Sequence, residues 1–298
     1  MSRAPPKHFR HGKTARAFAM LIATLVAPCA AHAQSIDPTP STTTTLNENV
    51  AQQVRWLSYA AASGTLASLP DDALVAVFRA LDPRTLPRYL EQGLRRYASC
   101  EFTILRRERI GGKWPGRPDH MLVRTTREPL RIYARWLPDG AHAGQEVIYD
   151  DTRRPGELYG HLGGLLGFLP MWASVDGPLA RAQSNHSIRE LSIGAITQRF
   201  IDEGRKFADA GITRPSNIEV TTVDGVRVLA LTYMAPAGQP TFYAKREVLG
   251  LDLEQPLFRT VESFDNDGVR FESVVFERIE PKSFDNLTFD PGNPGYRF

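Results

Sequence analysis

Residues 130–136 read Leu-Arg-Ile-Tyr-Ala-Arg-Trp and alternate between apolar side chains and charged or amphipathic ones. A period of two residues is typical of a β-strand with one buried face. The pattern places Leu130, Ile132, Ala134 and Trp136 toward the core and the intervening residues on the opposite face. Segments 121–125 and 146–149 are predicted as neighbouring strands.

Two hairpins are predicted further along the chain. Asp224-Gly225 joins the segments 217–223 and 226–233, and a two-residue turn of this composition favours an antiparallel hairpin. Asn266-Asp267-Gly268 joins the segments 258–264 and 269–276 in the same way. Strands that follow one another through short turns favour one large antiparallel sheet.

The strand pattern is interrupted between residue 161 and about residue 211. The interruption opens with the glycine-rich run His161 through Gly167, which has neither the spacing nor the terminal Lys-Ser/Thr of a phosphate-binding loop. We interpret the run as a flexible apolar turn, followed by an apolar loop at 168–171. Residues 188–207 are predicted to form a helix. The expected fold is α+β: a large curved antiparallel sheet, forming an incomplete β-barrel, with helices packed on one side that could enclose a cavity.

A helical segment, residues 45–98, is predicted to precede the sheet domain of residues 99–298. Its first helix carries an apolar stripe of Val50, Val54, Leu57 and Ala61, and Asp71 is predicted to cap the second. A third helix should end near residue 97. The amphipathic pattern indicates helices packed on a sheet rather than helices bound to a membrane surface.

Residues 1–33 have the pattern of a cleaved secretory signal peptide. Five basic residues precede an apolar run from Ala17 to Val26, and Ala31-His32-Ala33 then matches the signal peptidase site. The apolar run is too short for a transmembrane helix. Cleavage before Gln34 would leave a flexible leader, residues 34–44, and a periplasmic protein. A lipid anchor on Cys29 is the alternative, which Pro28 disfavours.

Charge and cysteine content exclude several classes of protein. The 36 basic and 33 acidic residues give a net charge of +3. Loss of the five basic residues of the signal peptide leaves 31 basic and 33 acidic residues, a net charge of −2. The mature chain therefore has no basic surplus that would indicate a nucleic-acid partner. Cys100 is the only cysteine after the predicted cleavage site, so no intramolecular disulfide is expected.

The motifs of common enzymes are missing. The sequence has no Gly-x-Ser-x-Gly elbow and no His-Glu-x-x-His zinc helix. His161 and His186 flank the glycine-rich run and, together with Asp176, could form a metal or acid–base site. The alternative is that each imidazole bonds only to local backbone. We therefore assign no catalytic residue, metal ligand or cofactor.

Several segments, in order, resemble one family of bacterial exported proteins, domain of unknown function 1571. These are residues 101–112, 144–149, 161–167, 176–180 and 289–298. Asn185-His186-Ser187-Ile188 is similar to the family's Asn-Arg-His-x-Ile segment but one residue shorter, which puts a role carried over to His186 in doubt. The resemblance covers about residues 97–298. The strand order is similar to that of the LolA, LolB and RseB group. This similarity implies an incompletely closed periplasmic β-barrel, with a helical lid and an apolar cavity for acyl chains.

The leading hypothesis is a non-catalytic periplasmic binding or carrier protein for a lipid-like ligand, such as the acyl chains of a lipid or lipoprotein. The predicted ligand-binding residues are Trp136, Ile132, His161, Gly163, Gly164, Trp172 and His186. The glycine-rich run, Trp172 and the following helix would act as the gate. One alternative is a metal-dependent or acid–base hydrolase that uses His161, Asp176 and His186. A second alternative is a sensory module that binds envelope proteins.

Overall fold

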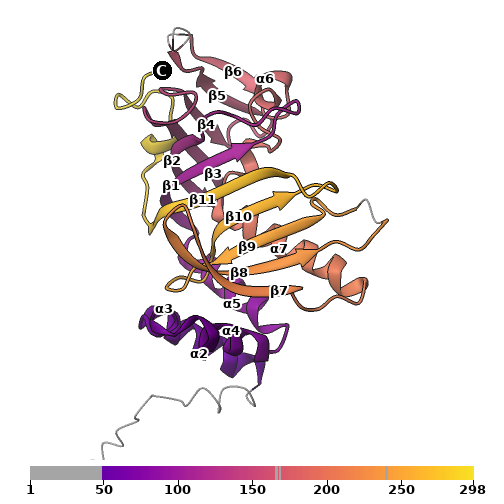
Figure 1. Ribbon diagram of the computed structural model, residues 1–298. Helices are drawn as coiled ribbons and strands as arrows, with labels where there is room; N and C mark the ends of the chain where they lie inside the picture. Colours follow the sequence, from indigo (N-terminus) through magenta and orange to yellow (C-terminus); the bar gives the residue numbers. More distant parts are fainter. Residues whose placement is uncertain (1–48, 165–166, 168, 239–240) are drawn as a thin grey trace, which may run out of the picture. The chain divides into compact units, whose positions relative to one another are not determined.

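One curled antiparallel sheet dominates the structure (Figure 1). In the computed structural model, residues 49–164, 167, 169–238 and 241–298 are described. The described strands form a sheet in the order β6-β5-β4-β3-β2-β1-β11-β10-β9-β8-β7, and all neighbours are antiparallel. The strands are β1 Ser99–Glu108, β2 Asp119–Arg127, β3 Leu130–Trp136, β4 Glu146–Asp150, β5 Glu157–His161, β6 Met171–Ser174, β7 Asn217–Val223, β8 Val226–Met234, β9 Arg246–Leu251, β10 Phe258–Phe264 and β11 Arg270–Pro281.

The sheet consists of two meanders that meet in the middle. Strands β1 to β6 form one meander and β7 to β11 the other, and pairing of β1 with β11 joins them. The edge strands β6 and β7 do not pair with each other, so the sheet curls without closing. The predicted α+β class and incomplete barrel are therefore confirmed.

Both predicted hairpins are present. Asp224 and Gly225 join β7 to β8 with φ angles of 46° and 84°, the left-handed conformation that a two-residue turn requires. The second turn joins β10 to β11 and has Gly268 at φ 73°. The strand at 130–136 also lies between the two predicted neighbours, as β3 between β2 and β4.

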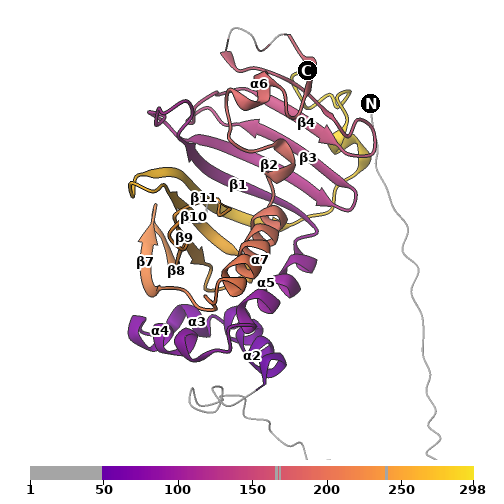
Figure 2. The same cartoon turned by 90° about the vertical axis from the view of Figure 1, so that its right-hand side faces the viewer.

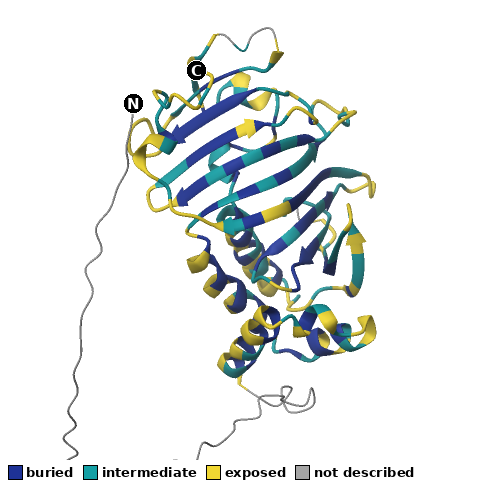
Figure 3. Cartoon of the chain, turned by 90° about the vertical axis from the view of Figure 1, so that its left-hand side faces the viewer, coloured by how far each residue is buried: buried dark blue, intermediate teal, exposed yellow. Residues whose placement is uncertain are grey.

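Between residues 49 and 98, four helices precede the sheet: α2 Val50–Ala62, α3 Thr65–Ser68, α4 Asp71–Ala80 and α5 Thr85–Arg96. The stripe predicted for the first helix is buried, and buried and exposed positions alternate around this group (Figure 3). Helix α2 packs on α5, and α4 packs on β7. The cap predicted at Asp71 is wrong. The N-cap is Pro70, and Asp71 lies in the first turn, where its negative charge interacts favourably with the helix dipole.

The segment between residues 161 and 211 is more structured than predicted. Residues 171–174 form the edge strand β6, which takes in the end of the apolar loop predicted at 168–171. The strand was missed because four largely exposed residues show no clear period. Helix α6 Pro178–Arg181 follows. The predicted helix 188–207 is a 3-10 turn, η2 Ile188–Glu190, followed by α7 Ile193–Asp209. Extended backbone at Ser192 separates the two, and its hydroxyl accepts a hydrogen bond from Ala195 N–H at 3.1 Å.

Helix α7 lies across one face of the sheet (Figure 2) and packs on β10 and on α5. The opposite face is partly covered by the C-terminal segment, which includes η3 Asn286–Phe289. Tyr133, predicted to face away from the core, is 2% exposed because it stacks on Tyr296 with ring centroids 4.0 Å apart. The second face of β3 is therefore buried at Tyr133, whereas Arg135 on the same face is exposed, as the alternation predicts.

Candidate ligand-binding cavity

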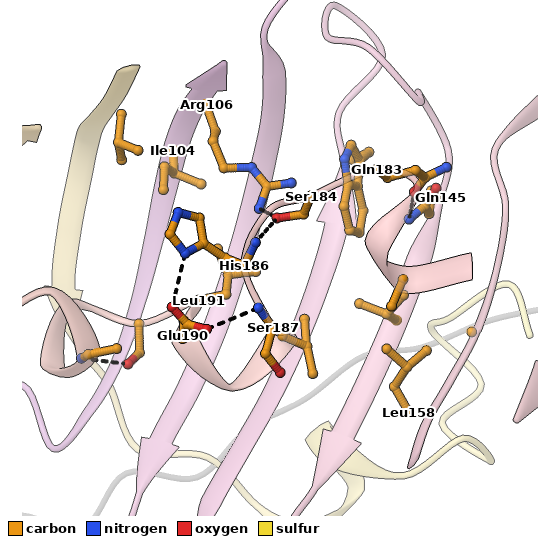
Figure 4. Close-up of a pocket in the computed structure, with 18 of the residues that line it drawn as sticks. Ile104, Arg106, Gln145, Leu158, Gln183, Ser184, His186, Ser187, Glu190 and Leu191 are labelled. Carbon is orange, nitrogen blue, oxygen red and sulfur yellow. Dashed lines mark hydrogen bonds and ion pairs between the residues drawn. The ribbon is translucent and has the colours of Figure 1, made fainter. Parts of the chain in front are cut away.

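A cavity of about 160 Å³ lies between the sheet and the segment from α6 to α7 (Figure 4). Alternate residues of the strands project into it, as the period of two requires. The apolar side chains from β1, β3, β4, β5, β9, β10 and β11 are Ile104, Trp136, Val147, Leu158, Leu249, Val261, Val274 and Phe276. Those from the covering segment are Leu179, Ile188, Leu191, Ile196 and Phe200.

Three large apolar side chains of this lining are also exposed to solvent. Leu169 is 50% exposed, Met171 47% and Leu179 42%. Exposed apolar side chains that continue into a cavity are typical of a site that binds an apolar molecule. We call these three residues the apolar rim.

An ionic network occupies part of the cavity wall. The His186 ring donates through Nδ1 to Glu190 Oε2 at 2.9 Å and through Nε2 to Glu272 Oε1 at 2.7 Å. The Tyr243 hydroxyl donates to the other oxygen of Glu272 at 3.0 Å. Arg199 forms an ion pair with Glu190 and lies over the Tyr243 ring. Each buried charge in this group therefore has a partner of opposite sign.

The network shifts the pKa values of its members. Burial opposes a charge on His186, but hydrogen bonds to Glu190 and Glu272 outweigh it and raise the pKa of His186 to about 9. The hydrogen bond from His186 lowers the pKa of Glu190 to about 2. Burial raises the pKa of Glu272, but the protonated imidazole more than compensates, so this pKa is lowered. His186 is therefore a cation at neutral pH.

Glu108 extends the network through the backbone that carries His186. Its carboxylate accepts hydrogen bonds from the Ser184 hydroxyl at 3.0 Å and from Asn185 N–H at 2.5 Å. His186 N–H donates to Ser184 Oγ at 3.0 Å, and Arg106 donates to the same oxygen at 3.1 Å (Figure 4). These bonds hold the loop before η2 against β1.

Within the described part of the chain, Glu108, His186 and Glu272 could hold a metal ion, since one ligand atom of each lies within 4.8 Å of the others. Both His186 nitrogens, however, already donate to carboxylates, and Arg106 lies 3.2 Å from Glu108. A cation here would have to displace the imidazole proton beside a guanidinium. The contacts fit an ion-pair network better than a metal site.

Glu247 is the remaining acid in the cavity lining. Among the residues that the structure describes, no hydrogen bond or ion pair is made to the Glu247 carboxylate, although its backbone is part of β9. Burial, reinforced by the negative charge of Glu272, raises the pKa of Glu247 to about 7. The cavity therefore gains a negative charge as the pH rises through neutrality.

The structure brings three of the seven predicted ligand-binding residues to the cavity: Trp136, His161 and His186. Ile132 lies fully buried in the core. Gly163 packs against backbone, where a Cβ atom would lie 2.5 Å from Ala143 O, and neither it nor Gly164 lines the cavity. Residues 165, 166 and 168 of the predicted gate lie outside the described residues.

Trp172, the seventh residue, packs on Tyr159 and Arg154, whereas Met171 and Ala173 on either side of it line the cavity. Strand geometry therefore directs Trp172 to the other face of β6.

The hydrolase hypothesis placed His161, Asp176 and His186 in one site. Among the described residues, no hydrogen bond or ion pair joins any two of them. The Asp176 carboxylate pairs with Arg181 at 3.0 Å and with Arg189 at 3.4 Å. The His161 Nδ1 atom lies 3.0 Å from the carbonyl oxygen of Leu162.

Sequence reasoning missed Glu108, Glu190, Tyr243 and Glu272. Glu108 and Glu272 are directly opposite each other in the pairing of β1 with β11. Like charges at such a pair are unfavourable unless a cation lies between them. The two strands are far apart in sequence, so only their pairing reveals why His186 is there. The available signal was an acid, Glu272, at the position that continues the alternate apolar residues Val274 and Phe276 toward the start of the strand.

The chain belongs to the family described as "Protein of unknown function (DUF1571)", whose pattern matches residues 97–298. This confirms the resemblance seen in the sequence. A comparison with curated proteins found no match. None of the described helices is both long and apolar enough to cross a membrane.

Among solved structures, the chain is similar to an uncharacterized conserved protein from Thermus thermophilus, with 8% identity and a TM-score of 0.38, covering 67% of this chain and 89% of that one. It is also similar to MucB in the MucA/MucB complex of Pseudomonas aeruginosa, with 14% identity, a TM-score of 0.38 and coverage of 70% and 61%. A LolA superfamily protein from Nitrosomonas europaea has 8% identity, a TM-score of 0.28 and coverage of 70% and 98%.

Proposed function

We propose that this protein binds an acyl chain or a similar lipid-like molecule in the cavity between the sheet and α7, without catalysis. The observation that carries the proposal is the apolar lining, which continues to solvent through the apolar rim. Burial of each methylene contributes about 0.8 kcal/mol. About ten buried methylenes would therefore contribute about 8 kcal/mol, which exceeds the lower end of the association cost, roughly 4 kcal/mol.

The hydrolase hypothesis has less support. Catalysis by His186 would require a ring nitrogen that can exchange a proton with a substrate, and both nitrogens are bonded to carboxylates. Asp176, its proposed partner, is paired with two arginines. The ionic network is better explained as a support that holds the cover of the cavity on β1 and β11.

A charge on the apolar rim should weaken binding. We expect Met171→Asp to raise the Kd for a dansyl-labelled fatty acid at least tenfold, because the carboxylate would lie against the ligand or lose its hydration. The measurement is a fluorescence titration, followed by displacement with phospholipid. Leu287→Asp is the matched control, since Leu287 is also 47% exposed but lies in η3 and does not line the cavity.

The two variants separate the cavity from the rest of the surface. Leu287→Asp should bind as the wild type does. Equal weakening in both variants would point to non-specific adsorption of the probe. If neither lipid nor fatty acid binds to the wild type, the proposal fails and a role in binding envelope proteins becomes the better hypothesis.

We also propose that the protein acts in the periplasm after cleavage of residues 1–33. The basic n-region, the short apolar run and Ala31-His32-Ala33 support this. Intact-mass measurement of the exported protein should show Gln34 as the first residue. A product that retains Cys29 with a diacylglycerol mass would contradict it and indicate a lipid anchor.

A further inference from the structure

The cavity wall contains buried polar atoms that the apolar lining does not explain. Four of these atoms have no hydrogen-bond partner among the described residues: Arg106 Nε, Trp136 Nε1, Gln145 Oε1 and His161 Nε2. Buried polar atoms are ordinarily paired, because an unpaired one loses the hydrogen bonds that it makes with water. A purely apolar ligand would leave these atoms unpaired, so the wall is suited to a ligand with a polar group.

Two of these atoms belong to neighbouring residues on one face of the sheet. Trp136 N–H donates to Gln145 O at 2.9 Å, and Gly144 N–H donates to Trp136 O at 3.0 Å. Trp136 and Gln145 are therefore opposite each other where β3 turns into β4, and both line the cavity. Side chains at directly opposite positions have Cβ atoms about 5 Å apart. The indole N–H of Trp136 and the amide oxygen of Gln145 therefore belong to the same wall of the cavity, at the ends of adjacent strands.

The acceptor is held in place by a third residue. Gln145 Nε2 donates to Gln183 Oε1 at 3.0 Å, and Figure 4 shows the two amides side by side. This bond fixes the amide plane of Gln145 and leaves its Oε1 atom as the free end. Gln183 lies in the segment that covers the cavity, so the pair also links the cover to the sheet.

We infer that Trp136 and Gln145 recognise an amide that carries the acyl chain of the ligand. The amide oxygen would accept from Trp136 Nε1, and the amide N–H would donate to Gln145 Oε1. The chain would extend along the apolar wall next to Val147. The inference rests on the proposed function and narrows the ligand class to amide-linked acyl compounds. An ester supplies the oxygen but no N–H, so it leaves Gln145 unpaired.

A set of matched ligands tests the inference in the intact exported protein. N-Methyldodecanamide has one N–H, whereas N,N-dimethyldodecanamide has none, and methyl dodecanoate replaces the nitrogen with oxygen. Each would displace the dansyl-labelled fatty acid. We expect the N-methyl amide to bind about tenfold more tightly than the other two, the effect of one buried acceptor left unpaired.

Three variants assign the effect to its residues. Gln145→Met keeps the length of the side chain and should abolish the preference for the N-methyl amide over the N,N-dimethyl amide. Trp136→Phe should weaken both amides about equally, because both present the oxygen. Trp172→Phe is the control, since Trp172 does not line the cavity, and should change neither affinity.

The outcomes distinguish this inference from the proposed function. If the probe binds but the wild type does not distinguish the three ligands, or prefers the ester, the inference is wrong and acyl binding stands. Persistence of the N–H preference in Gln145→Met would also overturn it. If the probe itself does not bind, the proposed function fails and the inference fails with it. The comparison of ligands on the wild type requires no variant to fold.

Discussion

His186→Leu is expected to lower the free energy of unfolding by about 3–5 kcal/mol, the usual cost of removing one partner from a buried ion pair. The change leaves Glu272 and Glu108, which face each other across β1 and β11, without the cation between them. Urea denaturation measures the loss. His120→Leu is the control, because His120 pairs with the more exposed Asp139 and Glu277 and should lose about 1 kcal/mol or less.

The pH dependence separates the charge of His186 from its packing. The pKa of His186 is raised from 6.5 to about 9 on folding, so its stabilisation is complete below pH 6.5 and is lost as the pH rises to 9. The stability of the wild type should therefore fall by about 3 kcal/mol through this window. The slope should be absent in His186→Leu. An unchanged slope in the variant would contradict the assignment of the charge.

Glu247→Gln is expected to stabilise the protein at pH 8 by about 3 kcal/mol and to have little effect at pH 4. The pKa of Glu247 is raised from 4.5 to about 7 on folding. The folded protein therefore holds the proton more tightly, and the wild type loses stability as the pH rises from 4.5 to 7. Glutamine keeps the shape of the neutral acid and removes this loss.

Thermal or urea denaturation at the two pH values measures the effect of Glu247→Gln. Glu219→Gln, at an exposed position of β7, should leave stability unchanged at both. If Glu247→Gln also left the stability unchanged at pH 8, the Glu247 carboxylate must contact water or a partner in the folded protein. The negative charge that we assign to the cavity above pH 7 would then be screened.

Local patterns in the sequence were sufficient for most of the sheet. The strand at 130–136 and the turns at Asp224-Gly225 and Gly268 depend on residues close together in the chain, and the structure has all three. The alternation could not show that Tyr133 is buried, because the covering residue, Tyr296, is more than 160 positions away. A segment that returns over a sheet leaves no trace in the strand that it covers.

The cavity was harder to predict than the sheet. His186 was identified because it and His161 flank the glycine-rich run, but its partner Glu272 depends on the pairing of β1 with β11. Trp172 was assigned to the gate from its apolar neighbours, whereas the register of β6 directs it away from the cavity. A shift of one residue decides between the two faces of a strand. An unrecognised short strand therefore leads to the wrong choice of side chain.

Photo-crosslinking tests the central claim most directly, because it records where the ligand lies. Palmitic acid that carries a diazirine near the end of its chain would be bound to the exported protein, irradiated and mapped by peptide mass spectrometry. Adducts are expected on the cavity lining, in the peptides that contain Leu158, Leu191 and Phe200, and should be lost when excess phospholipid competes. Adducts confined to the helices α2 to α5 or to the C-terminal segment 284–298 would contradict the central claim.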